Sequence, residues 1–199
     1  MGAAEAARLA IARRVLADAS GRVGVVPAGH SHGAARVRYL PTGLAALDAL
    51  LGGGLERGQL VELTGAPGSG RLALTLHLLG QATQQGEPVA LVDVADALNP
   101  DDLEASLRPR VLWVRPQGML ASLQAVDLLL DAGGFSLVVL YLVGATTPGQ
   151  GRRERVATTA WARLARRAES TRTTLLAVTD GSAAQAPGSF ASMVLGVEG

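Results

Sequence analysis

Residues 65–72 read Gly-Ala-Pro-Gly-Ser-Gly-Arg-Leu, and this stretch decides the fold. It lies between an apolar run at 59–64, which predicts a strand, and a run at 69–84, which predicts a helix. A strand, a glycine-rich turn and a helix in this order form the setting of a phosphate-binding loop of the G-x-x-x-x-G-K-[ST] type. In such a loop the backbone N–H groups cradle phosphates at the positive end of the helix.

The last two positions of the loop depart from that pattern. Arg71 stands in place of the lysine and keeps the charge, but its planar fork is bulkier than an ammonium group. Leu72 stands in place of the hydroxyl that would hold magnesium, and a leucine cannot coordinate a metal. We therefore interpret the loop as a degenerate cofactor site and expect it to be empty. Nucleotide binding without hydrolysis, through the loop amides and Arg71, remains an alternative. The loop residues concerned are Gly65, Gly68, Ser69, Gly70, Arg71 and Leu72.

Arginine supplies all 18 basic residues, and the chain has neither lysine nor cysteine. A GC-rich coding sequence accounts for this bias. Whatever its origin, it excludes a Schiff-base lysine, a lysine general base and a phosphate-binding lysine. The absence of thiols excludes disulfides, a cysteine nucleophile and a thiolate metal site.

Strands and helices alternate along the rest of the chain. We predict further strands at 88–92, 111–114, 136–142, 174–178 and 192–197, and further helices at 101–107, 120–132 and 152–170. Apolar strands that alternate with helices indicate an α/β fold with a mainly parallel sheet covered on both faces. Ligands of such folds lie at the carboxyl ends of the strands. A length of 199 residues and 48% hydrophobic content suit one core domain, which we place at 37–199.

The first 36 residues are predicted to form a separate unit. Residues 3–19 predict a helix, and residues 20–35, which lack periodicity, predict a flexible linker. The longest apolar run, 137–145, is about half the length of a membrane span, and the N-terminus has no secretory signal. We therefore expect a cytoplasmic protein without a membrane segment. His30 and His32 could form a metal-binding pair, but incidental surface histidines are favoured and we expect no metal. His77 is interpreted as a packing residue.

Charge is unevenly distributed although the net charge is only +1. Residues 87–104 hold six acids and no base, whereas residues 152–172 hold seven arginines and two glutamates. The basic segment is the candidate surface for nucleic acid or an acidic partner, although two solvated faces would also explain the pattern. Trp161 is the one candidate there for stacking on bases, and a packing role is favoured for it. Weak DNA binding without sequence readout is the expectation. The candidate arginines are Arg152, Arg153, Arg155, Arg163, Arg166 and Arg167.

From residue 39 to residue 197 the chain resembles the RecA family of recombinases. Four stretches carry the resemblance: PTGLAALD at 41–48, GGGLERGQLVE at 52–62, VDVADALNP at 92–100, and the apolar strand and loop at 137–148. The resemblance implies a RecA-like core. It also implies that the family's catalytic glutamate falls on Ala95 and its Walker B aspartate on Tyr141, while its γ-phosphate sensors fall near Thr179 and Asp180.

The resemblance therefore implies a protein that has lost catalysis. Phosphoryl transfer depends on metal ions and charge stabilisation, and the residues that would supply them are replaced. The family's DNA-binding loops are short here, at 144–151 and 180–191, and the second contains no arginine. We expect no enzymatic activity.

Short length and the LPTGLAALDALLGGGLERG opening resemble one branch of the family, the ImuA (SulA-like) group. This implies a non-enzymatic accessory role in the DNA-damage (SOS) response, in which the protein binds RecA, the polymerase homologue ImuB or both, and promotes translesion synthesis. In RecA-like filaments an N-terminal helix docks on the neighbouring protomer, which makes Leu9, Arg13, Val15 and Leu16 candidate partner-binding residues here and allows self-association. Docking on the chain's own core is equally open. The alternatives are a divergent ATP-dependent recombinase that uses Arg71, and a cell-division inhibitor.

Overall fold

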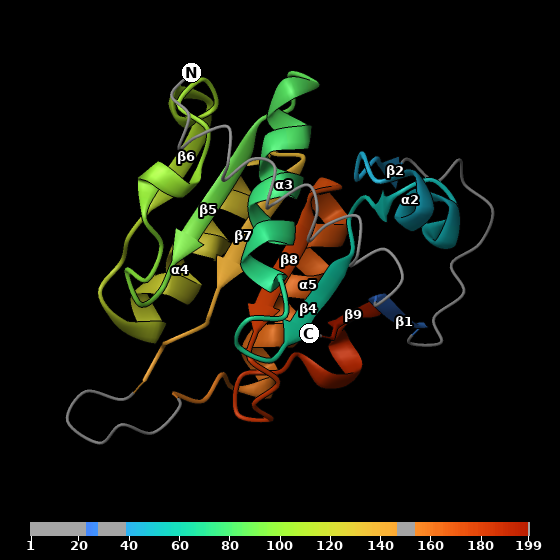
Figure 1. Ribbon diagram of the computed structural model, residues 1–199. Helices are drawn as coiled ribbons and strands as arrows, with labels where there is room; N and C mark the ends of the chain where they lie inside the picture. Colours follow the sequence, from blue (N-terminus) through green and yellow to red (C-terminus); the bar gives the residue numbers. More distant parts are fainter. Residues whose placement is uncertain (1–22, 28–38, 147–153, 199) are drawn as a thin grey trace.

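The computed structural model describes residues 23–27, 39–146 and 154–198. Its centre is a seven-stranded sheet with the order β1-β9-β4-β8-β7-β5-β6 (Figure 1). Six neighbouring strands run parallel and β1 runs antiparallel to β9, which confirms the predicted α/β class with a mainly parallel sheet. The strands are β1 Val23–Pro27, β4 Leu60–Gly65, β5 Val89–Asp93, β6 Val111–Val114, β7 Leu137–Tyr141, β8 Thr174–Thr179 and β9 Met193–Val197.

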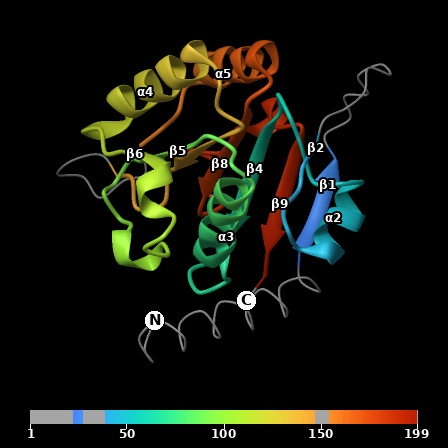
Figure 2. The ribbon, with the colours of Figure 1, turned by 90° about the horizontal axis from the view of Figure 1, so that it is seen from above.

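Helices cover both faces of the sheet. Helix α3 (Arg71–Gln84) lies on one face, and α4 (Gly118–Ala132) and α5 (Thr158–Thr171) lie side by side on the other (Figure 2). Each face has its own apolar core, because the strands are buried on both sides. The first core includes Leu63, Leu74 and Leu91, and the second includes Leu140 and Trp161. No helix among the described residues is long and apolar enough to cross a membrane.

A small unit stands beside the β1 end of the sheet (Figures 1 and 2). It consists of α2 (Ala45–Leu51) and a two-stranded sheet of β2 (Tyr39–Leu40) and β3 (Leu55–Glu56). The Asp48 carboxylate accepts hydrogen bonds from the Thr42 N–H at 2.8 Å, the Thr42 hydroxyl at 2.7 Å and the Gly43 N–H at 3.2 Å. His77 Nε2 lies 3.0 Å from the Thr42 carbonyl oxygen, which joins α3 to this turn. The Thr-Gly and Leu-Asp pairs at 42–48 therefore build a turn.

Part of the segment predicted as a linker is a strand. Residues Val23–Pro27 pair with β9 in a register that joins Val23 to Val197 and Pro27 to Met193. Three of these five residues are valine, which favours strands, and the proline stands at the end of an edge strand, where a missing N–H is tolerated. The prediction of a flexible linker over 20–35 is therefore wrong for 23–27. The helix predicted at 3–19 lies outside the described residues.

Two predicted helices have different bounds. Residues 101–107 were expected to form a helix, but the chain forms short 3₁₀ turns at Pro100–Asp102 and Arg108–Arg110, each with a proline in its first two positions. Proline favours the first turn of a helix and cannot continue one. The helix expected at 152–170 begins only at Thr158, since 154–157 are not helical and Ala157 is extended. Arg152 and Arg153 lie outside the described residues.

Candidate nucleotide-type site

The loop between β4 and α3 has the backbone path of a phosphate-binding loop. Strand β4 ends at Gly65 and α3 begins at Arg71, so the five residues 66–70 form the turn at the carboxyl edge of the sheet. Gly68 and Gly70 adopt φ angles of +83° and +93°, a region that glycine enters at little cost. The glycine spacing in the sequence thus serves the turn itself. No described side chain caps the start of α3.

Arg71 does not project into solvent from this loop. Its side chain is 6% exposed, and one guanidinium nitrogen donates hydrogen bonds to the Gly65 carbonyl and, at 3.0 Å, to the Thr179 carbonyl. The guanidinium therefore bridges the carboxyl ends of β4 and β8. Its Nε has no hydrogen-bond partner among the residues that the structure describes. Arg71 could contact a phosphate only by giving up contacts within the chain.

Tyr141 completes this buried cluster. It ends β7, is 4% exposed, and makes a side-chain hydrogen bond with Arg71. Burial raises the pKa of the Tyr141 hydroxyl, and the nearby Arg71 charge acts in the opposite direction. The structure thus brings together two residues that the resemblance singled out separately, Arg71 at the expected lysine position and Tyr141 at the expected Walker B position. Sequence comparison located both residues, but nothing in the spacing predicted their contact.

Ser69 and Leu72 lie on either side of the Gly70-Arg71 pair and make different contacts. The Ser69 hydroxyl is buried and has no hydrogen-bond partner among the described residues, and a Cβ added at Gly65 would lie only 2.5 Å from its oxygen. Leu72 packs against the apolar core on the α3 face, where its side chain contributes to packing. Ser69 thus lies against the start of the loop, whereas Leu72 points into the apolar core.

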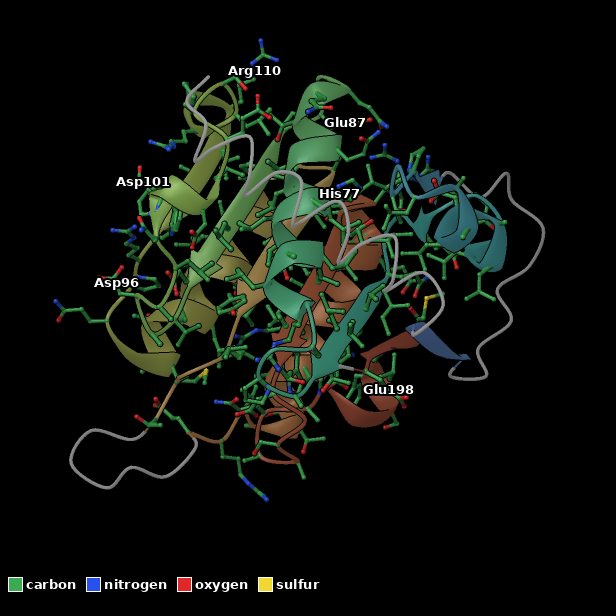
Figure 3. All side chains as sticks on the ribbon, viewed as in Figure 1. His77, Glu87, Asp96, Asp101, Arg110 and Glu198 are labelled. Atoms are coloured by element: carbon green, nitrogen blue, oxygen red, sulfur yellow. The ribbon has the colours of Figure 1, made fainter. Side chains whose placement is uncertain are left out.

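An open depression of about 490 Å³ lies beside the loop, at the carboxyl ends of β4, β8 and β9. Among the residues that the structure describes, its lining includes Asp180 and Glu198 and no basic side chain. Carboxylates repel the phosphates of a nucleotide. Figure 3 labels Glu198, one of the lining residues, near the C-terminal end of the chain.

Ala95, where the resemblance places the family's catalytic glutamate, carries no acid. Ala95 follows the end of β5 and faces the β7 end, since a Cβ at Gly144 would lie 3.4 Å from that of Ala95. The neighbouring Asp96 adopts a φ of +49° and forms an ion pair with Arg115 at 3.0 Å. Arg115 in turn lies over the Trp113 ring, 4.8 Å from its centroid. In Figure 3, Asp96 lies at the left edge of the molecule, well apart from Glu198 at the lower right.

Glu62 is a buried acid that the sequence reasoning missed. It lies in β4, is 5% exposed, and accepts a 2.7 Å hydrogen bond from the Thr179 hydroxyl. Burial raises the pKa of the Glu62 carboxyl, while this hydrogen bond lowers it in part. The signal was available, since a lone acid interrupts the otherwise apolar run at 60–63.

Replacing Glu62 by glutamine is expected to stabilise the protein at pH 7. Because the pKa of Glu62 is raised in the folded chain, the charged form costs stability as the pH rises above the ordinary value of 4.5. Glutamine can still accept the Thr179 hydrogen bond without a charge. Urea unfolding of both proteins across this pH range is expected to show a gain for Glu62→Gln at pH 7 that shrinks toward pH 4.5. An equal difference at every pH would contradict the burial of a titrating carboxyl.

Two arginines of the basic segment 152–172 form ion pairs between α5 and α4. Arg163 and Arg167 place their Nε atoms 3.5 Å and 3.3 Å from Asp127 of α4, and Arg167 also pairs with Asp131. Arg155 and Arg166 are exposed. The structure thus brings Arg163, Arg166 and Arg167 together. Leu9, Arg13, Val15 and Leu16, and the histidines His30 and His32, lie outside the described residues.

Trp161 is a core residue. It is 1% exposed and belongs to the cluster between the sheet and α4–α5, which confirms the packing role that the sequence favoured. It cannot stack on bases from that position. Within the described ranges, Tyr39 is the one aromatic side chain among the exposed large apolar residues, at 37% exposure.

Comparison with known proteins agrees with this geometry. A model of the RecA N-terminal domain family matches residues 7–181. Protein RecA of Streptomyces avermitilis is 38% identical over 116 residues, which are 56% of this chain and 30% of that protein. Protein RecA of Leifsonia xyli subsp. xyli is 37% identical over 122 residues, 57% of this chain and 33% of that protein. Protein RecA of Methylococcus capsulatus is 38% identical over 116 residues, which are 56% of this chain and 33% of that protein. The matches thus span about a third of the length of these curated relatives.

Proposed function

The chain belongs to the RecA N-terminal domain family, and from this premise we propose that it is a non-enzymatic accessory protein of the DNA-damage response. In this proposal it binds RecA, the polymerase homologue ImuB, or both, within the cytoplasm. It lowers recombination and favours translesion synthesis. The similarity to proteins named RecA supports the recombination and repair setting, and the ImuA-like role rests on the residues that depart from the family pattern.

The inward position of Arg71 is the observation that carries the proposal. Its Nη1 donates to the Gly65 and Thr179 carbonyls and its guanidinium also bonds to Tyr141, so the side chain is held within the chain instead of being presented to a phosphate, although its Nε donor is unused within the described residues. Leu72 offers no magnesium ligand, and Ala95 offers no base for an attacking water. These features favour a structural role for the loop over repeated binding and release of a nucleotide.

A mechanism follows from a retained fold without the ATP cycle. A protomer that presents a RecA-type surface can join the end of a growing filament, but it cannot pass through the nucleotide-dependent states that continue assembly. Such a protomer would cap the filament at stoichiometric amounts. The apolar residues Leu9 and Leu16 of the predicted N-terminal helix are the proposed contacts with the partner.

The test is a pull-down of the purified full chain against RecA and against ImuB, together with a RecA strand-exchange assay. We expect binding to at least one partner and inhibition of strand exchange near equal concentrations. Leu9→Glu with Leu16→Glu is expected to weaken both, whereas Leu50→Glu, on an exposed position of α2, is the matched control. Absence of binding to both proteins, with unchanged strand exchange, would sink the proposal. Cell filamentation on overexpression without RecA binding would favour a division inhibitor.

A further inference from the structure

The outer face of α4 and α5 combines exposed leucines with a row of arginines. Leu120 and Leu128 of α4 are 71% and 69% exposed, although they are large apolar side chains. They lie eight residues apart, with the exposed and uncharged Gln124 between them, so all three share one side of the helix. Two such leucines, about 12 Å apart along the axis, make a stripe that no described residue covers.

The edge strand β6 carries another exposed leucine on the same side of the sheet. Leu112 is 48% exposed, and Val114, two residues further along, packs against the core on the α4 side. Since side chains two apart in a strand point to the same face, Leu112 lies on the same side of the sheet as α4. Monomeric proteins rarely expose several neighbouring large apolar side chains without a binding role.

Basic side chains border the stripe on α5. Arg163, Arg166 and Arg167 line a depression of about 300 Å³ together with Asp131, Ser170 and Thr171. Asp127 and Asp131 hold Arg163 and Arg167 in place, and the Arg166 Nε donates to the Ala162 carbonyl at 3.2 Å. Three guanidinium groups are thereby fixed on one face, and each has more donors than these contacts use. Helices α4 and α5 run next to each other (Figure 2), and Asp127, the neighbour of Leu128 in α4, pairs with Arg163 and Arg167 of α5, so the stripe lies near these arginines.

We propose that this α4–α5 face binds an acidic amphipathic helix of a partner protein. The apolar side of that helix would cover Leu120 and Leu128, and its carboxylates would meet Arg163, Arg166 and Arg167. The proposal rests on the protein-binding role proposed above and adds the chemistry of the partner. It explains why α4 exposes leucines beside the arginines of α5.

Two other occupants fit the surface less well. Nucleic acid binding to single strands uses aromatic platforms, and Trp161 is buried under this face. Residues 3–19 of the chain itself carry three arginines against Glu5 and Asp18, so their charge does not complement the α5 arginines. An acidic helix satisfies both the leucines and the charges.

The probe is a fluorescein-labelled synthetic peptide with leucines at helical spacing and glutamates at the other positions, titrated with the full chain and followed by anisotropy. The same peptide with lysine in place of glutamate, and a labelled single-stranded oligonucleotide, are the comparisons. We expect the acidic peptide to bind at least about tenfold more tightly than the lysine peptide, and less tightly as salt increases. Binding of the acidic peptide no tighter than that of the lysine peptide would overturn the proposal.

Variants locate the site. Arg166→Glu and Leu128→Glu, both at exposed positions, are each expected to weaken binding of the acidic peptide by about tenfold or more. Arg110→Glu and Leu50→Glu are controls at exposed positions on other elements and are expected to change nothing.

Unchanged binding in Arg166→Glu and Leu128→Glu would overturn the assignment. So would oligonucleotide binding lost with Arg166→Glu, or self-association in sedimentation lost with Leu128→Glu. RecA and ImuB pull-downs on the same variants separate failure of this site from failure of the proposed function.

Discussion

Replacing Arg71 by alanine is expected to lower the free energy of unfolding by about 2–4 kcal/mol. The substitution leaves the Gly65 and Thr179 carbonyls without their donor and removes the hydrogen bond to Tyr141 from a buried cluster. Urea unfolding measures the change. Arg166→Ala is the matched control, because that arginine is exposed and its loss is expected to cost less than about 0.5 kcal/mol. A comparably small effect of Arg71→Ala would mean that the guanidinium does not hold β4 and β8 together.

Arg71→Lys separates charge from shape in the same experiment. A lysine ammonium has three donors on one nitrogen, whereas the guanidinium carries five donors on a rigid plane that bonds to both carbonyls and to Tyr141, so lysine is expected to keep only part of these contacts. We therefore expect an intermediate stability. Recovery to the full stability would assign the effect of Arg71 to its charge alone.

Replacing Trp161 by alanine is expected to lower the free energy of unfolding by about 3–5 kcal/mol. The side chain is 1% exposed and lies at the centre of the core between the sheet and the two outer helices, so truncation leaves a cavity. Trp161→Phe keeps most of the volume and removes an indole N–H that has no hydrogen-bond partner among the described residues, so its cost is expected to be smaller. Urea unfolding measures both variants. Full stability of Trp161→Ala would contradict the burial of the ring.

The strands of this fold were predictable because a parallel sheet buries them on both sides. The runs around Leu91 and Val139 are apolar on successive positions, and both faces of each strand pack against helices. Strand β1 was not predictable in the same way. Its five residues stand in a stretch of glycine, serine and histidine, and what makes them a strand is the free edge of β9, which is a tertiary effect.

In the candidate site, the sequence indicated where residues lie along the strands but not which side chains contact one another. The resemblance to family motifs pointed to Arg71, Ala95 and Tyr141, which follow or end the parallel strands β4, β5 and β7, and a parallel sheet brings its carboxyl ends to one edge. The inward turn of Arg71 depends on side-chain packing and on the Thr179 carbonyl, 108 residues away in sequence. Likewise, the charge run at 152–172 predicted a basic surface, but the pairing of Arg163 and Arg167 with α4 required the packing of two helices.

Phosphate release from magnesium ATP, with and without single-stranded DNA, tests the central claim most directly. The account predicts that the full chain releases no more phosphate than buffer alone and that DNA does not change this, while RecA measured alongside responds to DNA. The reason is that Arg71 is held within the core and that no residue of the loop replaces the magnesium hydroxyl. DNA-stimulated phosphate release that disappears in Arg71→Ala would contradict the account and would make this chain an ATPase.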